Sequence, residues 1–151
     1  MHVGVEIMAE YDPLKLENQL CFPLYACAKG VVNRYAPLLE KIGLTYTQYI
    51  VMMVLWEHKS LTVKELGSRL HLDSGTLTPL LKRLEASGLI TRERDRKDER
   101  SVIATITEKG TSLREKALEV PAQLAGCLPL SLEESQTLYT LLYKVLNAVS
   151  E

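Results

Sequence analysis

The chain is poor in the features that mark membrane and secreted proteins. Its longest apolar run covers residues 50–56, far fewer than the roughly 18–20 residues that a membrane-spanning helix needs. A basic start followed by an apolar stretch, as in a secretory signal peptide, does not occur at the N-terminus. We therefore expect no membrane segment and a cytoplasmic location.

Residues that bind metals or form covalent intermediates are also scarce. The three cysteines, Cys21, Cys27 and Cys127, form no even set and no CxxC pair, and the three histidines are scattered. A zinc site is therefore not expected. The sequence also has no glycine-rich phosphate loop, no GxSxG motif and no metal-spaced set of histidine and glutamate. We predict a protein without a cofactor that is not an enzyme.

Charge of one sign is likewise not in large excess. The net charge of −1 argues against a protein that coats nucleic acid nonspecifically. Residues 64–100 nevertheless hold nine Lys and Arg against seven Asp and Glu, whereas the segments on either side are net negative. Affinity for a polyanion would have to come from geometry. At 151 residues and 46% hydrophobic composition, the chain is expected to fold as one domain over residues 1–151.

A helix followed by a β-hairpin is predicted between residues 71 and 107. Asp73 and Ser74 are favourable N-cap residues, and Gly88 stands where a helix over residues 74–87 would stop. Apolar residues at helical spacing lie between these signals: Leu77, Leu80, Leu81 and Leu84. After Gly88 the hydrophobic period changes to two, over residues 89–94 and again over 102–106, around a charged tip at residues 95–100.

A second helix signal stands just before this unit. Residues 62–65, with the sequence TVKE, have the spacing of a capping box, and residues 61–63 could add a short strand to the hairpin. Helix, tight turn, helix and hairpin in this order predict a winged helix-turn-helix over residues 45–107. The expected fold class is therefore mainly α with a small β wing.

Polar and cationic side chains of this unit suit a DNA surface. Ser74, Thr76 and Thr78 lie in the first turn of the second helix, which suits contacts to base edges and phosphates in a major groove. Long cations follow on the helix and at the hairpin tip: Lys82, Arg83, Arg96, Lys97 and Arg100. They could lie near phosphates or enter an adjacent minor groove. The alternative is a solvated helix followed by an ordinary charged turn.

Helices are also predicted on both sides of the unit. A helical pattern begins at Leu14, and Pro23 requires that the helix either starts near Phe22 or bends; a short separate helix is expected over residues 37–42. Beyond residue 107, a helix interrupted near residues 121–129 precedes a final capped helix. The segments 14–42 and 108–151 are predicted dimerisation helices at the two termini, because their apolar faces need another surface. The alternative is that they fold back on their own domain.

Two further parts of the chain have sequence signals: the N-terminus and the first helix of the winged helix-turn-helix unit. Residues 1–13 show no periodicity and predict a loose arm. The helix predicted over residues 45–57 is apolar on most sides, so we expect it to be buried. Met52, Met53 and Trp56 are interpreted as its core contacts.

Three segments of the chain resemble a known family. Residues 72–101, LDSGTLTPLLKRLEASGLITRERDRKDERS, are similar to the DNA-binding core of MarR-type transcriptional regulators. Residues 16–26, LENQLCFPLYA, and residues 44–58, LTYTQYIVMMVLWEH, resemble the organic-hydroperoxide sensors called OhrR. The resemblance extends over about residues 14–149, and it implies a dimer that binds a near-palindromic double-stranded DNA operator.

The resemblance also implies the roles of a cysteine, two tyrosines and a wing. It makes Cys21 the thiol that reacts with organic hydroperoxide as inducer, and Tyr35 and Tyr46 the residues that hydrogen-bond to it. By sequence alone, tyrosines near a cysteine are more often packing residues. In the same way the resemblance implies that Arg100 reaches the minor groove, held by Asp98.

The remaining cysteines leave alternatives open. In two-cysteine members of the family, a cysteine in the region of Cys127 on the partner subunit resolves the oxidised thiol; the alternatives here are a buried structural cysteine or an external resolving thiol. Cys27 is interpreted as a core residue. The expected function is a repressor released by oxidation of Cys21, against a MarR-type regulator of a small phenolic or drug-like ligand, or a thiol peroxidase without DNA.

Overall fold

Three helices of the structure begin at reciprocal capping boxes. These are α3 (Tyr46–His58), α4 (Val63–Leu70) and α8 (Leu132–Val149). In each, the N-cap hydroxyl accepts from the backbone N–H of the third helical residue, whose side chain accepts from the N-cap backbone N–H. The N-cap residues are Thr45, Thr62 and Ser131. The sequence analysis predicts a capping box before α4, a helix from residue 45 and a final capped helix, and the structure confirms all three.

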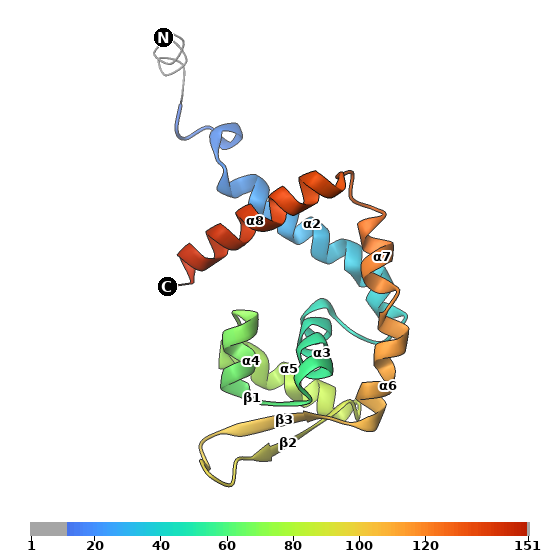
Figure 1. Cartoon of the computed structure of the whole chain (residues 1–151). Coiled ribbons are helices and arrows are strands. Elements are labelled where there is room, and N and C mark those ends of the chain that lie inside the picture. The colour runs from blue at the N-terminus through green and yellow to red at the C-terminus, as the bar shows by residue number, and fades with distance from the viewer. Residues whose placement is uncertain (1–11, 151) are drawn as a thin grey trace.

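A computed structural model describes residues 12–150 (Figure 1). The loose arm expected over residues 1–13 lies almost entirely outside this range. The remaining elements are a 3-10 turn η1 (Leu16–Asn18), α2 (Cys21–Glu40), β1 (Ser60–Thr62), α5 (Ser74–Ala86), β2 (Ile90–Arg94), β3 (Val102–Ile106), α6 (Glu108–Ala117) and α7 (Val120–Ala125). The fold is mainly helical with a small wing, as the sequence predicts.

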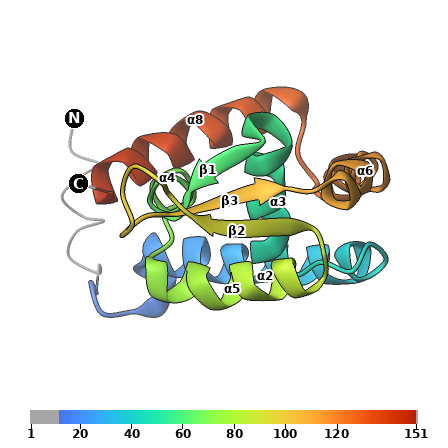
Figure 2. The same cartoon turned by 90° about the horizontal axis from the view of Figure 1, so that it is seen from below.

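The three strands form one antiparallel sheet in the order β1-β3-β2 (Figure 2). Ser60 pairs with Thr105, and their hydroxyl oxygens lie 2.8 Å apart. Ile90 pairs with Ile106, and the alternation along both strands turns Ile90 and Ala104 into the core. The predicted third strand is therefore present, one residue earlier than expected.

The core of the head, which we define as residues 45–107, lies between α3, α4, α5 and the sheet. Its fully buried side chains include Val51, Met52, Leu55, Leu66, Leu77, Leu81 and Leu84. Trp56 is half-buried, and its indole Nε1 donates to the Gly110 carbonyl oxygen at 2.8 Å. Met53 was predicted as a core contact, but it is 46% exposed. An apolar residue points outward there because α3 is covered on only part of its circumference.

The first long helix departs from the sequence prediction. The separate helix expected over residues 37–42 is wrong, because α2 continues through Pro37 to Glu40. Pro37 loses its own hydrogen bond and crowds the preceding turn, but its φ is fixed near the helical value and it lies close to the end of the helix, so the last turn can still form. Pro23 lies in the first turn, where no partner for its N–H is needed. The start near Phe22, and not the bend, is the alternative that the structure supports.

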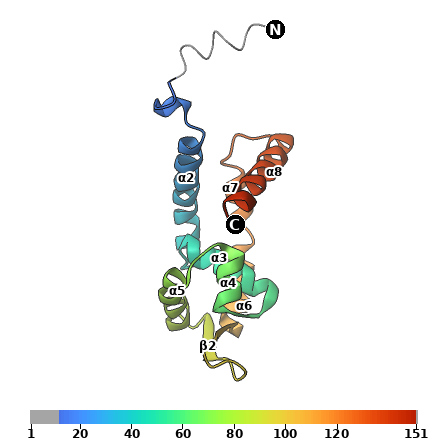
Figure 3. The same cartoon turned by 90° about the vertical axis from the view of Figure 1, so that its left-hand side faces the viewer.

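The flanking helices leave much apolar surface uncovered. The main packing partners of α2 are α3 and α7, and α8 contains no buried residue. Figure 3 shows α2 and α8 as separate arms on the side of the head opposite the wing. Exposed apolar side chains of α8 include Leu138, Tyr139, Leu141, Leu142, Tyr143, Val145 and Val149. Among residues 12–150, no helix is both long and apolar enough to span a membrane.

The junction between the hairpin and α6 generates a stability prediction. A Cβ added at Gly110 would stand 2.2 Å from the Leu89 carbonyl oxygen and 2.8 Å from Cγ1 of Ile106. Gly110→Ala should therefore lower the free energy of unfolding by about 2–4 kcal/mol, measured by urea denaturation. Gly126→Ala is the control, because its nearest neighbours would lie at 3.7 Å. Equal stability of the two variants would contradict this packing.

Candidate functional site

The N-terminus of α5 presents the predicted polar residues to solvent. Asp73 accepts from the backbone N–H of Thr76 at 2.8 Å and from its hydroxyl at 3.2 Å, so this cap fixes the first turn. Ser74, Thr76 and Thr78 are all exposed. The turn before α5 is tight, because a Cβ at Gly67 would stand 2.6 Å from the Leu72 carbonyl oxygen. The sequence thus holds α5 close against α4 with its polar first turn outward.

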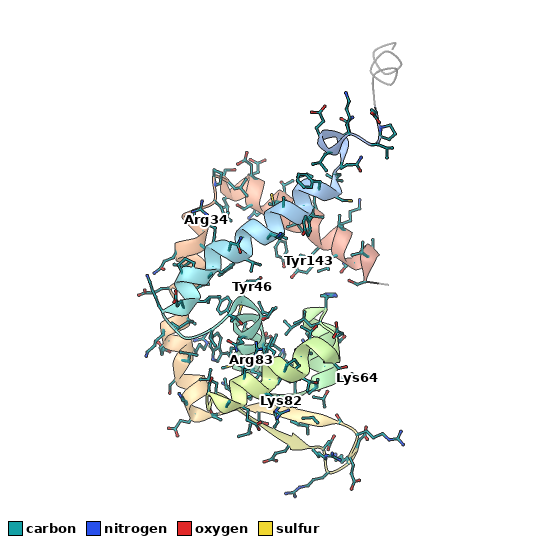
Figure 4. All side chains as sticks on the ribbon, turned by 180° about the vertical axis from the view of Figure 1, so that it is seen from behind. Arg34, Tyr46, Lys64, Lys82, Arg83 and Tyr143 are labelled. Atoms are coloured by element: carbon teal, nitrogen blue, oxygen red, sulfur yellow. The ribbon has the colours of Figure 1, made fainter. Side chains whose placement is uncertain are left out.

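The cations of α5 continue the same exposed surface. Lys82 lies one turn beyond Thr78, and Arg83 lies two turns beyond Thr76, so both extend the polar side of the helix. Both side chains are exposed (Figure 4). The opposite side carries the buried leucines of the core. A ligand on this surface would meet hydroxyls at one end of α5 and positive charge further along.

The hairpin tip is organised by two aspartates. Asp95 accepts from the backbone N–H of Lys97 at 3.0 Å, and Asp98 accepts from the backbone N–H of Arg100 at 3.1 Å. Arg96, Lys97 and Arg100 remain exposed. The Asp98 carboxylate thus holds the backbone of Arg100, and no ion pair between their side chains occurs among residues 12–150. The long cations are left available at the end of the wing.

A groove of about 520 Å³ joins α4, α5 and the wing. Its lining includes Ser74 and Thr78 of α5 and Asp98 and Arg100 of the wing. It also includes two residues of α4 that sequence reasoning missed, Lys64 and Ser68. Lys64 was visible only as part of a capping box, which marks a helix start and says nothing of the groove.

A tyrosine cluster lies where α2 meets α3. The rings of Tyr35 and Tyr46 have centroids 4.9 Å apart, and that of Tyr49 lies 5.8 Å from Tyr35. Burial raises the pKa of Tyr35 above its ordinary value, and the neighbouring Tyr46 and Tyr49 raise it further. A phenol with a raised pKa stays protonated at neutral pH and keeps a hydrogen to donate. The cluster can therefore offer hydrogen bonds to an anion such as a thiolate.

The candidate thiol is not near this cluster within one chain. Cys21 opens α2 and Tyr35 follows fourteen residues later on the same helix, which separates them by about 21 Å at a rise of 1.5 Å per residue. Of the three residues that the resemblance groups together, one chain brings together only Tyr35 and Tyr46. The Cys21 thiol is exposed.

The other two cysteines are exposed as well. The prediction that Cys27 is a core residue is wrong, because the first half of α2 is uncovered by other described elements. Cys127 lies between α7 and α8, with its Sγ 3.4 Å from the Gln123 carbonyl oxygen, so it is not a buried structural cysteine in the single chain. The start of α2 and the α7–α8 connection lie at opposite ends of α8 in Figures 1 and 2.

The described residues offer little for a metal ion. Among residues 12–150, no group of three or more His, Cys, Asp or Glu side chains is arranged to hold one.

Comparison with known proteins identifies relatives of this arrangement. A family model described as transcriptional regulator SarA/Rot matches residues 33–117. The organic hydroperoxide resistance transcriptional regulator of Bacillus subtilis (strain 168) is 49% identical over 142 residues, which cover 94% of this chain and 97% of that protein. The regulator SarZ of Staphylococcus haemolyticus is 39% identical over 87% of this chain and 90% of its own length.

Solved structures agree with these relatives. Reduced AbfR bound to DNA matches with a TM-score of 0.76 and 37% identity, over 97% of this chain and 98% of that one; AbfR is a protein of Staphylococcus epidermidis. Its disulfide form matches with a TM-score of 0.67 and 36% identity, over 97% and 96% of the two chains. The winged-helix fold and the predicted resemblance are thereby confirmed, and the chain belongs to the MarR/SarA family of transcriptional regulators, in the branch of the organic-hydroperoxide regulators.

Proposed function

We propose that the chain is a dimeric repressor that binds a near-palindromic DNA operator and releases it when an organic hydroperoxide oxidises Cys21. The observation that carries the DNA half of this proposal is the groove between α4, α5 and the wing, lined by hydroxyls and by Arg100. Its two sides suit a major groove and an adjacent minor groove. The relative AbfR is solved bound to DNA, and this supports the same use of the groove here.

Exposed apolar surface distinguishes the head from the flanking helices. The head, residues 45–107, buries its own core, whereas the helices of residues 14–42 and 108–151 expose large apolar side chains. A second copy of the chain can cover those faces, and a two-fold dimer would set two heads roughly 34–36 Å apart on DNA. We propose that all these parts form one domain over residues 1–151.

The sensing half of the proposal depends on that dimer. Because α2 separates Cys21 from Tyr35 by about 21 Å, the tyrosines that hydrogen-bond to the thiol must come from the partner. In this arrangement Tyr35 and Tyr46 of one protomer donate to the Cys21 thiolate of the other. Two such sites then lie at the two ends of the α2 pair.

The proposed reaction is a two-electron oxidation. The Cys21 thiolate attacks one peroxide oxygen, the O–O bond breaks, and the departing alkoxide takes a proton to become an alcohol. The resulting sulfenic acid condenses with the Cys127 thiol of the partner, which forms the disulfide and releases water. A disulfide requires Cα atoms within about 7 Å. If the reduced dimer holds Cys21 and the partner's Cys127 farther apart than this, oxidation must move the terminal helices, and the two heads lose their spacing.

A second candidate function is favoured by one cavity. A pocket of about 340 Å³ lies between α3 and the α6–α7 segment, and its lining includes Tyr49, Trp56, Glu57 and Arg114. An aromatic ring and a guanidinium beside apolar side chains suit a small phenolic or drug-like acid. DNA binding that such a ligand weakens and cumene hydroperoxide does not would favour this alternative. Absence of specific DNA binding would favour a thiol peroxidase instead.

The DNA contact of the wing is testable with a duplex that wild-type protein selects from a random pool. Arg100→Ala should weaken binding to this duplex by about 1–3 kcal/mol, because a cation at the wing tip is lost. The measurement is fluorescence anisotropy at constant salt, with Glu99→Ala as the control for truncation at the tip. Unchanged affinity of the Arg100 variant would exclude insertion of the wing.

The disulfide is testable on non-reducing gels. Wild type treated with cumene hydroperoxide should run as a covalent dimer, whereas Cys21→Ser and Cys127→Ser should each run as monomers. Cys27→Ser is the matched control and should still crosslink, because the proposal gives it no role. Crosslinking of the Cys127 variant, or a Cys21–Cys27 bond detected by mass spectrometry, would contradict this pairing.

The trans arrangement of thiol and tyrosines is testable with mixed dimers. In one dimer, Cys21→Ser is on one chain and Tyr35→Phe on the other; the remaining Cys21 then faces an intact partner tyrosine. In the other, a double-variant chain is paired with wild type, so that the remaining Cys21 faces Phe. Trapping of sulfenic acid by dimedone should be about tenfold slower in the second dimer, for loss of one charge-assisted hydrogen bond. The reverse order would indicate a cis arrangement.

A further inference from the structure

One carboxylate of α5, the proposed recognition helix, is hydrogen-bonded to the wing. Oε2 of Glu85, in the last turn of α5, accepts from Arg92 Nε at 3.1 Å and from Nη2 at 2.8 Å. Oε1 accepts from the backbone N–H of Arg92 at 3.1 Å. The guanidinium group thus binds by two nitrogens, and the same carboxyl group also holds the β2 backbone. Charge-assisted bidentate pairs of this kind fix relative orientation as well as contributing energy.

The pair is distinctive within the described part of the chain. Among residues 12–150, its hydrogen bonds are the only side-chain ones that join α5 to a strand of the hairpin. The side chains are partly sheltered, with 23% of Arg92 and 38% of Glu85 exposed. The other ion pair in that range joins the sequence neighbours Glu57 and His58. Within the described residues, side-chain hydrogen bonds between α5 and the hairpin strands therefore occur only between Glu85 and Arg92.

The charge of Glu85 is otherwise unfavourable where it stands. The last turn of a helix disfavours an anion, because the carbonyl end of the helix dipole is negative. A carboxylate on a helix that binds DNA also repels phosphates. Hydrogen bonds from Arg92 hold the pKa of Glu85 below its usual range, so the carboxylate stays charged. Arg92 on β2 therefore supplies the interactions that offset this unfavourable charge.

A small change in the angle of the wing at the Glu85–Arg92 pair displaces the wing tip. Arg92 pairs with the buried Ala104 in the middle of β2, and the tip begins three residues further along, at Asp95. A strand rises by about 3.3 Å per residue, so a tilt of roughly 10° at Arg92 would move Asp95, about 10 Å away, by about 2 Å. Added to a hydrogen-bond distance of about 3 Å, that displacement is enough to take Arg100 out of a contact.

We infer that Glu85 and Arg92 are positioning residues for DNA recognition, which fix the angle between wing and recognition helix so that α5 and Arg100 engage one operator together. This inference rests on the proposed function, since it needs the wing to contact DNA. Neither residue itself has to touch the nucleic acid. Their contribution is therefore expected to vanish once the wing contact is removed.

The test uses the sign of the effect. If only charge mattered, Glu85→Gln would strengthen DNA binding and Arg92→Gln would weaken it. If the pair positions the wing, both variants should weaken binding to the selected duplex, by about 5- to 30-fold. Glu93→Gln and Arg94→Gln on the same strand are the matched controls, and they should move affinity in opposite directions by charge alone. The measurement is anisotropy on full-length protein.

A double-mutant cycle gives the second readout. In an Arg100→Ala background, Glu85→Gln should add less than about a twofold loss, because the wing contact is already gone. The exchanged pair Glu85→Arg with Arg92→Glu should recover part of the affinity. A scrambled duplex of equal length reports nonspecific binding. Urea midpoints of every variant check the fold, and the exchanged pair still decides the question if Glu85→Gln unfolds.

Each outcome has a defined meaning. Opposite effects of Glu85→Gln and Arg92→Gln, or a full additional loss in the Arg100→Ala background, overturn the positioning role alone. An unaffected Glu85→Gln in a protein that loses affinity with Arg100→Ala does the same. Wild type that binds the selected and scrambled duplexes equally, or that is indifferent to Arg100→Ala, overturns the proposed operator contact and this inference with it.

Discussion

The unbroken course of α2 is the constraint on which the rest of the proposed mechanism depends. A helix cannot fold back on itself, so residues at its first turn and near its end stay a fixed distance apart. Pro37 follows Tyr35 near the C-terminal end of α2, so a bend at Pro37 would not bring Cys21 closer to Tyr35. The same helix exposes apolar side chains along the half that carries the thiol. In the proposed dimer, a partner would therefore both cover this apolar surface and supply the tyrosines for the Cys21 thiol.

The tyrosine cluster is connected through α3 to the junction between the head and α6. Tyr46 and Tyr49 lie on α3, and Trp56, two turns further, donates to the Gly110 carbonyl oxygen at 2.8 Å. Gly110 packs directly against the Leu89 backbone, at the point where α5 passes into the wing. Close-packed contacts of this kind transmit a displacement because they have little free volume to absorb it. A shift of the flanking helices would therefore be felt where recognition helix and wing are joined.

Most local signals gave correct predictions, although the separate helix expected over residues 37–42 was wrong; features that depend on tertiary neighbours were predicted poorly. Capping spacing and hydrophobic period identified the head, because both act within a few residues. Burial was misjudged at Met53 and Cys27, since apolar side chains look alike in sequence whether or not another element covers them. Glu85 and Arg92 resemble ordinary surface charges, and only the return of β2 beside α5 makes them a pair. The separation of thiol and tyrosines follows from helix geometry, once α2 is known to be continuous.

The modest charge of the head makes the spacing of the two heads important in the proposed dimer. With nine cations against seven anions over residues 64–100, one head can neutralise few phosphates, and nonspecific attraction stays weak. Binding by two linked heads is strong only while their separation matches the DNA repeat, because the second contact is then intramolecular. When that match is lost, each head keeps only its own weak affinity. In the proposed dimer, a redistribution of the terminal helices by a few ångströms, without unfolding of either head, would therefore be sufficient to separate protein from operator.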